Sequence, residues 1–287
     1  MAARFWIPGG SNILDNVGTV NYSATTGGAS TGTALSINDT LTIDAALAGG
    51  TVIMGPGAIG MQNLVMNTMV GTLDAATNAP TVALNVSTTT FASTGTSTRT
   101  INLGASVWNI TSTALSTIIN FGTTTGLTFN AGTSVFNILG VNNGRMTINL
   151  GGLTWNEINM IATGRGSYNV LGVNPTINTL KIIGRQDVEM ENSRIFTIPN
   201  LVIDGTDISN MVNIVASDST GIATIANSGG GTWDYALFRR LTFTGAGAKV
   251  ANNSIDLGLN TGITINPPSI GGGGGGLATP LFGGGVI

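Results

Sequence analysis

The carboxylates with the most suggestive spacing lie in the segment Gln186–Asn192, which reads QDVEMEN. In an extended strand Asp187, Glu189 and Glu191 share one face, and the apolar residues between them occupy the other. Two carboxylates roughly 5–9.5 Å apart can act as the acid and the nucleophile or base of glycoside cleavage. The alternative, which we prefer, is a solvated acidic patch. Its neighbouring cations would be Lys181, Arg185 and Arg194.

Other catalytic chemistry has little support in the sequence. There is no His and no Cys, so the commonest general base, the commonest metal ligand and the thiol nucleophile are all missing. Four aromatic residues could stack on sugar rings: Trp108, Trp155, Tyr168 and Trp233. In the run LTW, however, Trp155 lies on the same side of a strand as Leu153, which favours a place in the core. We therefore expect no enzyme activity, no cofactor and no metal.

The elements that would position these residues repeat along the chain. GLTFN at 126–130 returns as GLTWN at 152–156, which is 26 residues later. Two further short β-type runs lie between the copies, and turns rich in Gly and Asn separate them. A period of 20–50 residues signals a repeat architecture. Three strands per period predict an all-β, right-handed parallel β-helix, or β-solenoid, with three short strands per coil.

Three segments follow from this pattern. Residues 1–38 are expected to form an N-terminal cap or attachment segment, 39–266 the parallel β-helix, and 267–287 a Pro/Gly-rich C-terminal tail. Within the β-helix, runs of three to six residues alternate apolar residues with Thr or Asn. An interior ladder is expected to consist of the leucines that occupy the same place in successive runs: Leu127, Leu153, Leu180 and Leu201.

The composition narrows the possible partners. Charged residues are 8% of the chain and the net charge is −3, so the groups that hydrate the surface must be mainly hydroxyls and amides. Arg239-Arg240 is the one adjacent basic pair, which argues against nucleic-acid binding. The sequence contains neither a run of 18 apolar residues nor a secretory signal, so we expect no membrane insertion. A chain of this kind that acts outside a cell would leave it by lysis or within a particle.

The two ends carry the residues expected to make assembly contacts. Phe5 and Trp6 are large anchors near the start, and a six-glycine spacer at 271–276 precedes the last apolar residues. Those residues are Leu277, Leu281, Phe282, Val286 and Ile287. Two interpretations stay open: a flexible tail, or a tether that docks on a neighbouring chain. With a surface so poor in charge, we expect a homotrimer.

Three stretches resemble phage-encoded, Thr/Gly-rich proteins of the tail or virion surface. They are residues 91–136, the opening ARFWIPGG at 3–10, and residues 211–248. The usual aromatic closing strand of that family is replaced here by ITINPPS at 263–269 and a glycine run. The resemblance implies a non-enzymatic virion protein on the particle exterior, tailspike-like or fibre-like, that contributes to host attachment. Its partners would be other virion proteins and a host surface polysaccharide. Alternatives are a capsid decoration protein and a polysaccharide-degrading tailspike.

Overall fold

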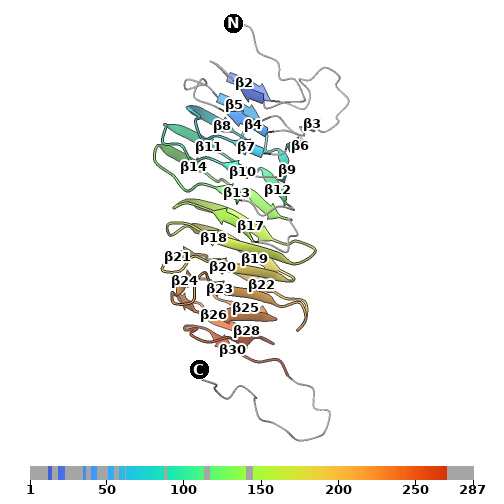
Figure 1. Ribbon diagram of the computed structural model, residues 1–287, viewed down its shortest axis with the longest axis vertical. Helices are drawn as coiled ribbons and strands as arrows, with labels where there is room; N and C mark the ends of the chain where they lie inside the picture. Colours follow the sequence, from blue (N-terminus) through green and yellow to red (C-terminus); the bar gives the residue numbers. More distant parts are fainter. Residues whose placement is uncertain are drawn as a thin grey trace, which may run out of the picture.

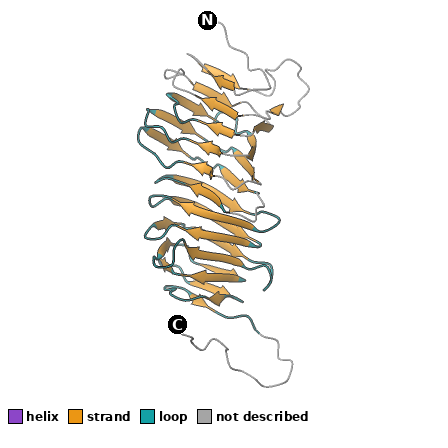
Figure 2. Ribbon diagram, in the orientation of Figure 1, coloured by secondary structure: helices purple, strands orange, loops and turns teal. Residues whose placement is uncertain are grey.

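The chain is a tall stack of parallel β-strands in the computed structural model (Figure 1). The structure describes residues 12–14, 19–22, 35–36, 40–43, 51–54, 58–61, 63–86, 89–112, 117–139 and 145–269. Within these residues Figure 2 shows strands and loops but no helix. The prediction of an all-β parallel β-helix with three strands per coil is confirmed.

Sheet A is one continuous wall of the stack. Its neighbouring strands, in order, are β1 (Asn12–Leu14), β4 (Thr40–Ile43), β7 (Asn63–Val65), β10 (Thr89–Ala92), β13 (Thr117–Asn120), β16 (Met146–Asn149), β18 (Gly166–Leu171), β20 (Gln186–Met190), β23 (Val212–Ala216), β26 (Ala236–Arg239) and β29 (Ile255–Asp256). Every third strand of the first coils belongs to this sheet, as a three-sided coil requires.

Sheet C is the second continuous wall. Its strands are β3 (Leu35–Ser36), β6 (Ala58–Met61), β9 (Thr81–Val86), β12 (Val107–Ser112), β15 (Val135–Ile138), β17 (Thr154–Met160), β19 (Thr176–Ile183), β22 (Asn200–Asp204), β25 (Gly231–Asp234), β28 (Lys249–Asn252) and β30 (Thr264–Ile265). Three further strands pair beside this path: β21 (Ile195–Thr197), β24 (Ala223–Ala226) and β27 (Leu241–Thr244).

The third side begins as sheet B, which consists of β2 (Thr19–Tyr22), β5 (Thr51–Met54), β8 (Gly71–Asp74), β11 (Arg99–Asn102) and β14 (Leu127–Asn130). After β14 the side continues in the first half of β17, because the tilted rings of Trp155 and Phe129 pack against each other with centroids 4.8 Å apart. From there it passes to the first half of β19 and then to β21, β24 and β27. The labels of β8, β11, β14, β21 and β24 lie at the left of Figure 1.

Alternation of buried and accessible residues builds the core. In β12, for example, Trp108 and Ile110 are buried while Val107 and Asn109 face outward. Rings stack from coil to coil inside the first half of the stack. This aromatic cluster comprises Phe91, Trp108, Phe121, Phe129, Phe136 and Trp155. A cluster of this size buries a large apolar area at the centre of the coils.

Coil length varies, and this corrects the expected leucine ladder. Arg99 pairs with Leu127, Val135 with Glu157 and Asp204 with Asp234, so the separation along the chain between paired residues falls and then rises again along the stack. Leu180 does lie opposite Leu201. Leu127 and Leu153, by contrast, belong to the third side of the coil, so the four leucines do not form one column. A fixed sequence period cannot give the register when turns differ in length.

The described strands begin inside the segment that was expected to be a cap. β1, β2 and β3 pair in parallel with β4, β5 and β6, so residues 12–36 contribute one strand to each wall. The proposed assembly residues of both ends, which are Phe5, Trp6, Leu277, Leu281, Phe282, Val286 and Ile287, lie outside the described residues.

Candidate functional site

The acidic residues singled out from the sequence lie on the outer surface of sheet A. In β20 the side chains alternate as expected, with Val188 and Met190 buried and with Asp187 and Glu189 accessible. Glu191 follows directly after the strand. The structure therefore places the three carboxylates along one strand on an outward face.

Each of these carboxylates has its own arginine. Arg165 forms an ion pair with Asp187, and Arg145 forms one with Glu189. Both arginines come from elements that precede β20 in the stack. Asp187 also accepts a hydrogen bond from the Asn213 side chain of β23, at 3.2 Å. The acidic strip is thus held between neighbouring coils.

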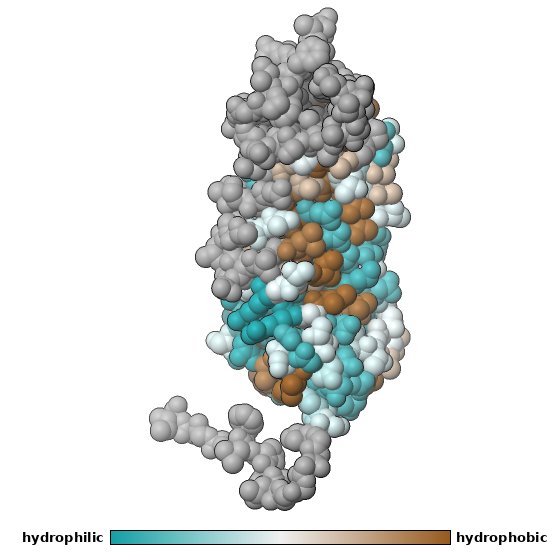
Figure 3. All heavy atoms as spheres, turned by 90° about the vertical axis from the view of Figure 1, so that its right-hand side faces the viewer, coloured by the Kyte–Doolittle hydropathy of each residue, from teal (hydrophilic) through white to brown (hydrophobic). Residues whose placement is uncertain are grey.

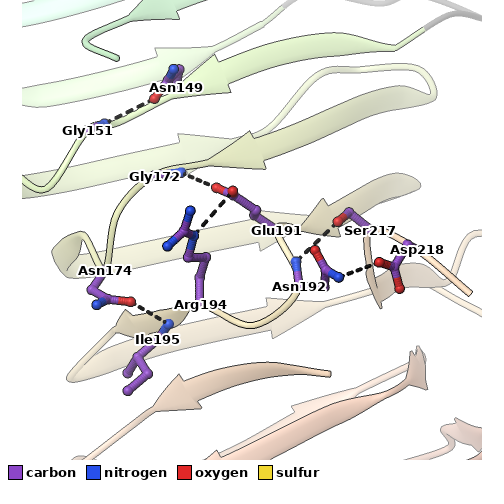
Figure 4. A network of polar contacts seen from close by, with 10 residues as sticks. All are labelled: Asn149, Gly151, Gly172, Asn174, Glu191, Asn192, Arg194, Ile195, Ser217 and Asp218. Atoms are coloured by element: carbon purple, nitrogen blue, oxygen red, sulfur yellow. Dashed lines mark hydrogen bonds and ion pairs between the residues drawn. The ribbon is translucent and has the colours of Figure 1, made fainter. Parts of the chain in front are cut away.

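Glu191 is fixed by a backbone amide as well as by an arginine (Figure 4). One of its oxygens accepts a hydrogen bond from the Gly172 amide at 2.9 Å, and the other accepts one from Arg194 Nε at 3.2 Å. The same figure shows Asn192 reaching Ser217 and Asp218 in the next coil. Both oxygens of Glu191 are therefore engaged in contacts that stabilise the surrounding turns.

The expected counter-ions are only partly correct. Arg194 does pair with Glu191, but Lys181 lies on sheet C and pairs with Glu157 at 2.7 Å. The sequence missed Arg145 and Arg165, because their approach to β20 depends on a strand register that local spacing cannot supply. An arginine bound to each carboxylate occupies oxygens that would have to face the substrate in a glycosidase. This arrangement supports the interpretation of the strip as structural.

The aromatic residues considered for sugar stacking are core residues. Trp108, Trp155 and Tyr168 are fully buried, and Trp233 is nearly so. Each occupies an inward position of its strand, as was expected for Trp155. None of the four presents its ring at the surface, where a sugar could bind.

A regular surface on the third side of the coil was not foreseen. We call it the threonine face. Thr51, Thr72, Thr100 and Thr128 stand opposite one another on four successive strands. The same position continues as Thr154, Thr176 and Thr197. All seven side chains are half-buried or exposed, since the inward positions beside them hold the core. Neighbouring strands lie about 4.8 Å apart, so the hydroxyls repeat at that interval.

A second column of polar groups runs beside the threonines. It holds Asp74, Asn102, Asn130, Asn156 and Asn178, each two residues after a threonine of the first column. Asn130 donates a hydrogen bond to the Asn102 side chain at 2.6 Å. The Asp74 carboxylate is occupied by its own turn, where it accepts bonds from Ala76 and Thr77. The recurring signal Thr-x-Asn, as in TIN, TFN and TWN, could have identified this surface from the sequence.

The threonine face differs in chemistry from the side shown in Figure 3. That view, of the right-hand side of Figure 1, shows apolar residues interspersed with polar ones. On the threonine face, Arg99 belongs to β11 but points inward and is 1% exposed. Its guanidinium donates to backbone carbonyls of the turns, including those of Ser97, Thr123 and Thr125. Arg99 therefore adds no charge to the outward surface, where Asp74 is the charged member of the second column.

Within the part of the chain that the structure describes, no group of three acidic, His or Cys side chains is placed to hold a metal ion. The described residues also contain no helix with the length and apolar character needed to cross a bilayer. The chain matches no protein-family model, no curated protein and no solved structure.

Proposed function

We propose that this chain is a non-enzymatic bacteriophage virion protein, a tailspike-like, fibre-like or surface subunit that contributes to host attachment through its threonine face. The observation that carries the proposal is the column of threonines from Thr51 to Thr197. Hydroxyls and amides both donate and accept hydrogen bonds, as do the groups of a host surface polysaccharide. Individually weak contacts repeated over many coils can together hold a particle to a cell.

Two further observations support a binding role instead of a catalytic one. The candidate carboxylates Asp187, Glu189 and Glu191 each pair with an arginine. The sequence resemblance to phage surface proteins points to the same role. We also propose a homotrimer on the exterior of the virion, which light scattering of the full chain at micromolar concentration tests directly. A monomer mass would contradict the trimer.

Adsorption of phage particles that carry this chain tests the attachment role. The purified protein should lower adsorption by competing for the host surface. The change Thr100→Lys with Thr128→Lys should abolish competition, because it places two positive charges among the hydroxyls and amides of this face. The matched control is Thr147→Lys with Thr179→Lys, on the outer surfaces of sheets A and C, which should compete like the unaltered protein.

An antibody label on intact particles completes the test. We expect the label on the particle exterior at the tail. Label over the capsid shell, with no competition by the soluble protein, would overturn the attachment role and identify a capsid decoration protein instead.

A further inference from the structure

A ladder of asparagines on the outer surface of sheet C ends at a lysine. Asn109, Asn137 and Asn159 stand opposite one another on β12, β15 and β17. The amides of Asn137 and Asn159 each donate to the side-chain oxygen of the asparagine before them, at 2.8 Å and 2.9 Å. The next position of the ladder, on β19, holds Lys181, directly opposite Asn159. A primary amine therefore stands where the ladder pattern would place the next amide.

The last asparagine of the ladder has an oxygen without a partner. Asn159 is 7% exposed, and its Oδ1 accepts no hydrogen bond. In Asn109 and Asn137 this oxygen faces the next strand and accepts from the next amide. By the same arrangement, the Asn159 oxygen faces the strand of Lys181. A buried carbonyl group that lacks a donor is costly to maintain, so this position calls for an explanation.

A carboxylate stands beside both groups. Glu157 lies two residues before Asn159, on the same outward side of β17, and accepts a hydrogen bond from Lys181 Nζ at 2.7 Å. Hydrogen bonds from Lys181, and then from Asn159, lower the pKa of Glu157. The side chains of Glu157 and Lys181 are 22% and 37% exposed, so most of this group is shielded from water. An amine, a carboxamide and a carboxylate thus meet at one place.

We propose that Lys181 and Asn159 join in an isopeptide bond, with Glu157 as the group that moves the protons. Glu157 takes a proton from the Lys181 ammonium, and the freed amine attacks Cγ of Asn159. The attacking nitrogen passes its extra proton to Nδ2, the bond between Cγ and Nδ2 breaks, and ammonia leaves. It departs as ammonium with the proton that Glu157 held. The balance is one ammonium and one primary amide converted to one secondary amide and one ammonium.

The bond would fasten two neighbouring coils to each other. It would link β17 to β19, which are adjacent strands of sheet C, in the part of the stack where the coils become shorter. A covalent link that closes a loop restricts the unfolded chain and so stabilises the folded one. It would also explain why Asn159 is buried with an unpartnered oxygen, since that geometry precedes the reaction.

Mass spectrometry of the folded, full-length protein tests the bond. The intact mass should be lower than the sequence mass by one ammonia. Trypsin should release a branched peptide in which residues 146–165 are joined to residues 166–185, because a linked Lys181 is no longer cleaved. Absence of this peptide from the folded protein would overturn the proposal, whatever the behaviour of any variant.

Three variants sharpen the result. Lys181→Arg keeps a cation beside Glu157 but cannot attack, so it should retain the full mass. Glu157→Gln should slow linkage by about a hundredfold, which is typical for loss of a group that transfers protons. Lys249→Arg, at the other lysine of the chain, should leave linkage unchanged. An ammonia loss that persists in Lys181→Arg would indicate cyclisation of an asparagine on its own and would also overturn the proposal.

Discussion

The coils of residues 51–139 and those of residues 145–269 differ most in charge. The first group contains two charged residues, Asp74 and Arg99, while the second contains seventeen. Both charged side chains of the first group form hydrogen bonds with backbone groups. Asp74 accepts from an amide of its own turn, and Arg99 donates to carbonyls inside the coil. In the second group Arg145, Arg165 and Lys181 pair with carboxylates on other strands.

Coil length, by contrast, varies within each group. Thr51 pairs with Thr72 but Arg99 with Leu127 in the first group, and Asp204 pairs with Asp234 but Gly231 with Lys249 in the second. In the first group a separate turn at 131–134 also divides β14 from β15. In β17 and β19 that turn is absent, and one longer strand serves two sides of the coil, but from β21 onward the two sides again have separate strands.

Each group is stabilised in its own way. The first group holds the aromatic cluster up to Phe136, and Trp155 adds a ring to it from the start of the second group. The second group buries rings of its own at Trp233, Phe238 and Phe243, and its neighbouring coils are also joined by ion pairs on their outer surface. The comparison teaches that one fold can add surface ion pairs to a core of buried rings in one group of coils and rely on the rings in the other.

Removing a ring from the aromatic cluster should have the largest effect, and Trp155, at the start of the second group, packs against three rings of the first. Trp155 contacts Phe121, Phe129 and Phe136 with centroids 5.3, 4.8 and 5.1 Å apart. We expect Trp155→Ala to lower the free energy of unfolding by about 3–5 kcal/mol, because it leaves a cavity among these rings. Denaturant melts measure this. Trp233→Ala is the matched change nearer the C-terminal end of the stack, where two rings surround the indole, and an equal or larger loss there would contradict the larger effect expected of the aromatic cluster.

The buried arginine should matter more than any arginine of the acidic strip. Arg99→Met leaves several carbonyls of the turns without a donor, which we expect to cost about 2–3 kcal/mol of the free energy of unfolding. Arg165→Met removes an ion pair whose arginine is half exposed, and such pairs contribute about 0–1 kcal/mol. Thermal melts of the two variants should therefore differ clearly. Equal melting temperatures would show that the Arg99 contacts with the turns add little.

The sequence predicted the fold well where the signal was local. Alternation of apolar residues with Thr and Asn identified most of the strands from Thr40 onward, and it placed Val188 and Met190 inside. Strands with small or acidic residues were missed, such as GTLD of β8 and GTWD of β25, because their inward positions carry a single large apolar residue each.

Contacts between coils were beyond local reasoning. Arg145 and Glu189 are 44 positions apart along the chain, and their approach depends on the lengths of the two coils between them. For the same reason the expected partner Lys181 was wrong for the acidic strip. The threonine face was within reach, because Thr-x-Asn recurs in the sequence, but its alignment becomes visible only with the register. The register is what the sequence pattern alone lacks.

Acid should loosen the coils of residues 145–269 first. Hydrogen bonds from the Gly221 and Thr220 amides lower the pKa of Asp218, and the Asn210 side chain, with the Ser209 amide, lowers that of Asp207. Because each folded pKa lies below its ordinary value of about 3.9, the stabilisation is present above that pH and is lost as pH falls through the folded pKa.

Pepsin digestion at about pH 3, below the ordinary aspartate pKa, can locate the weakened part. We expect the first cuts within 145–269, and Asp218→Asn should be cut at a rate that depends less on pH. First cuts within 51–139, where Asp74 is the one carboxylate, would contradict the assignment of acid sensitivity to the charged coils.

The smallest effect on stability is expected on the threonine face, at the point where the two groups of coils meet. Thr154 is exposed on β17, so Thr154→Asp should change the free energy of unfolding by no more than about 0.5 kcal/mol. Leu153, which packs against the core from a partly buried position, is the matched control, and Leu153→Asp should cost about 1–3 kcal/mol. Denaturant melts that rank the two variants in the opposite order would show that the inward and outward positions of this strand are exchanged. If the ranking holds while Thr154→Asp reduces competition for phage adsorption, the face contributes to binding at a position where it contributes almost nothing to folding.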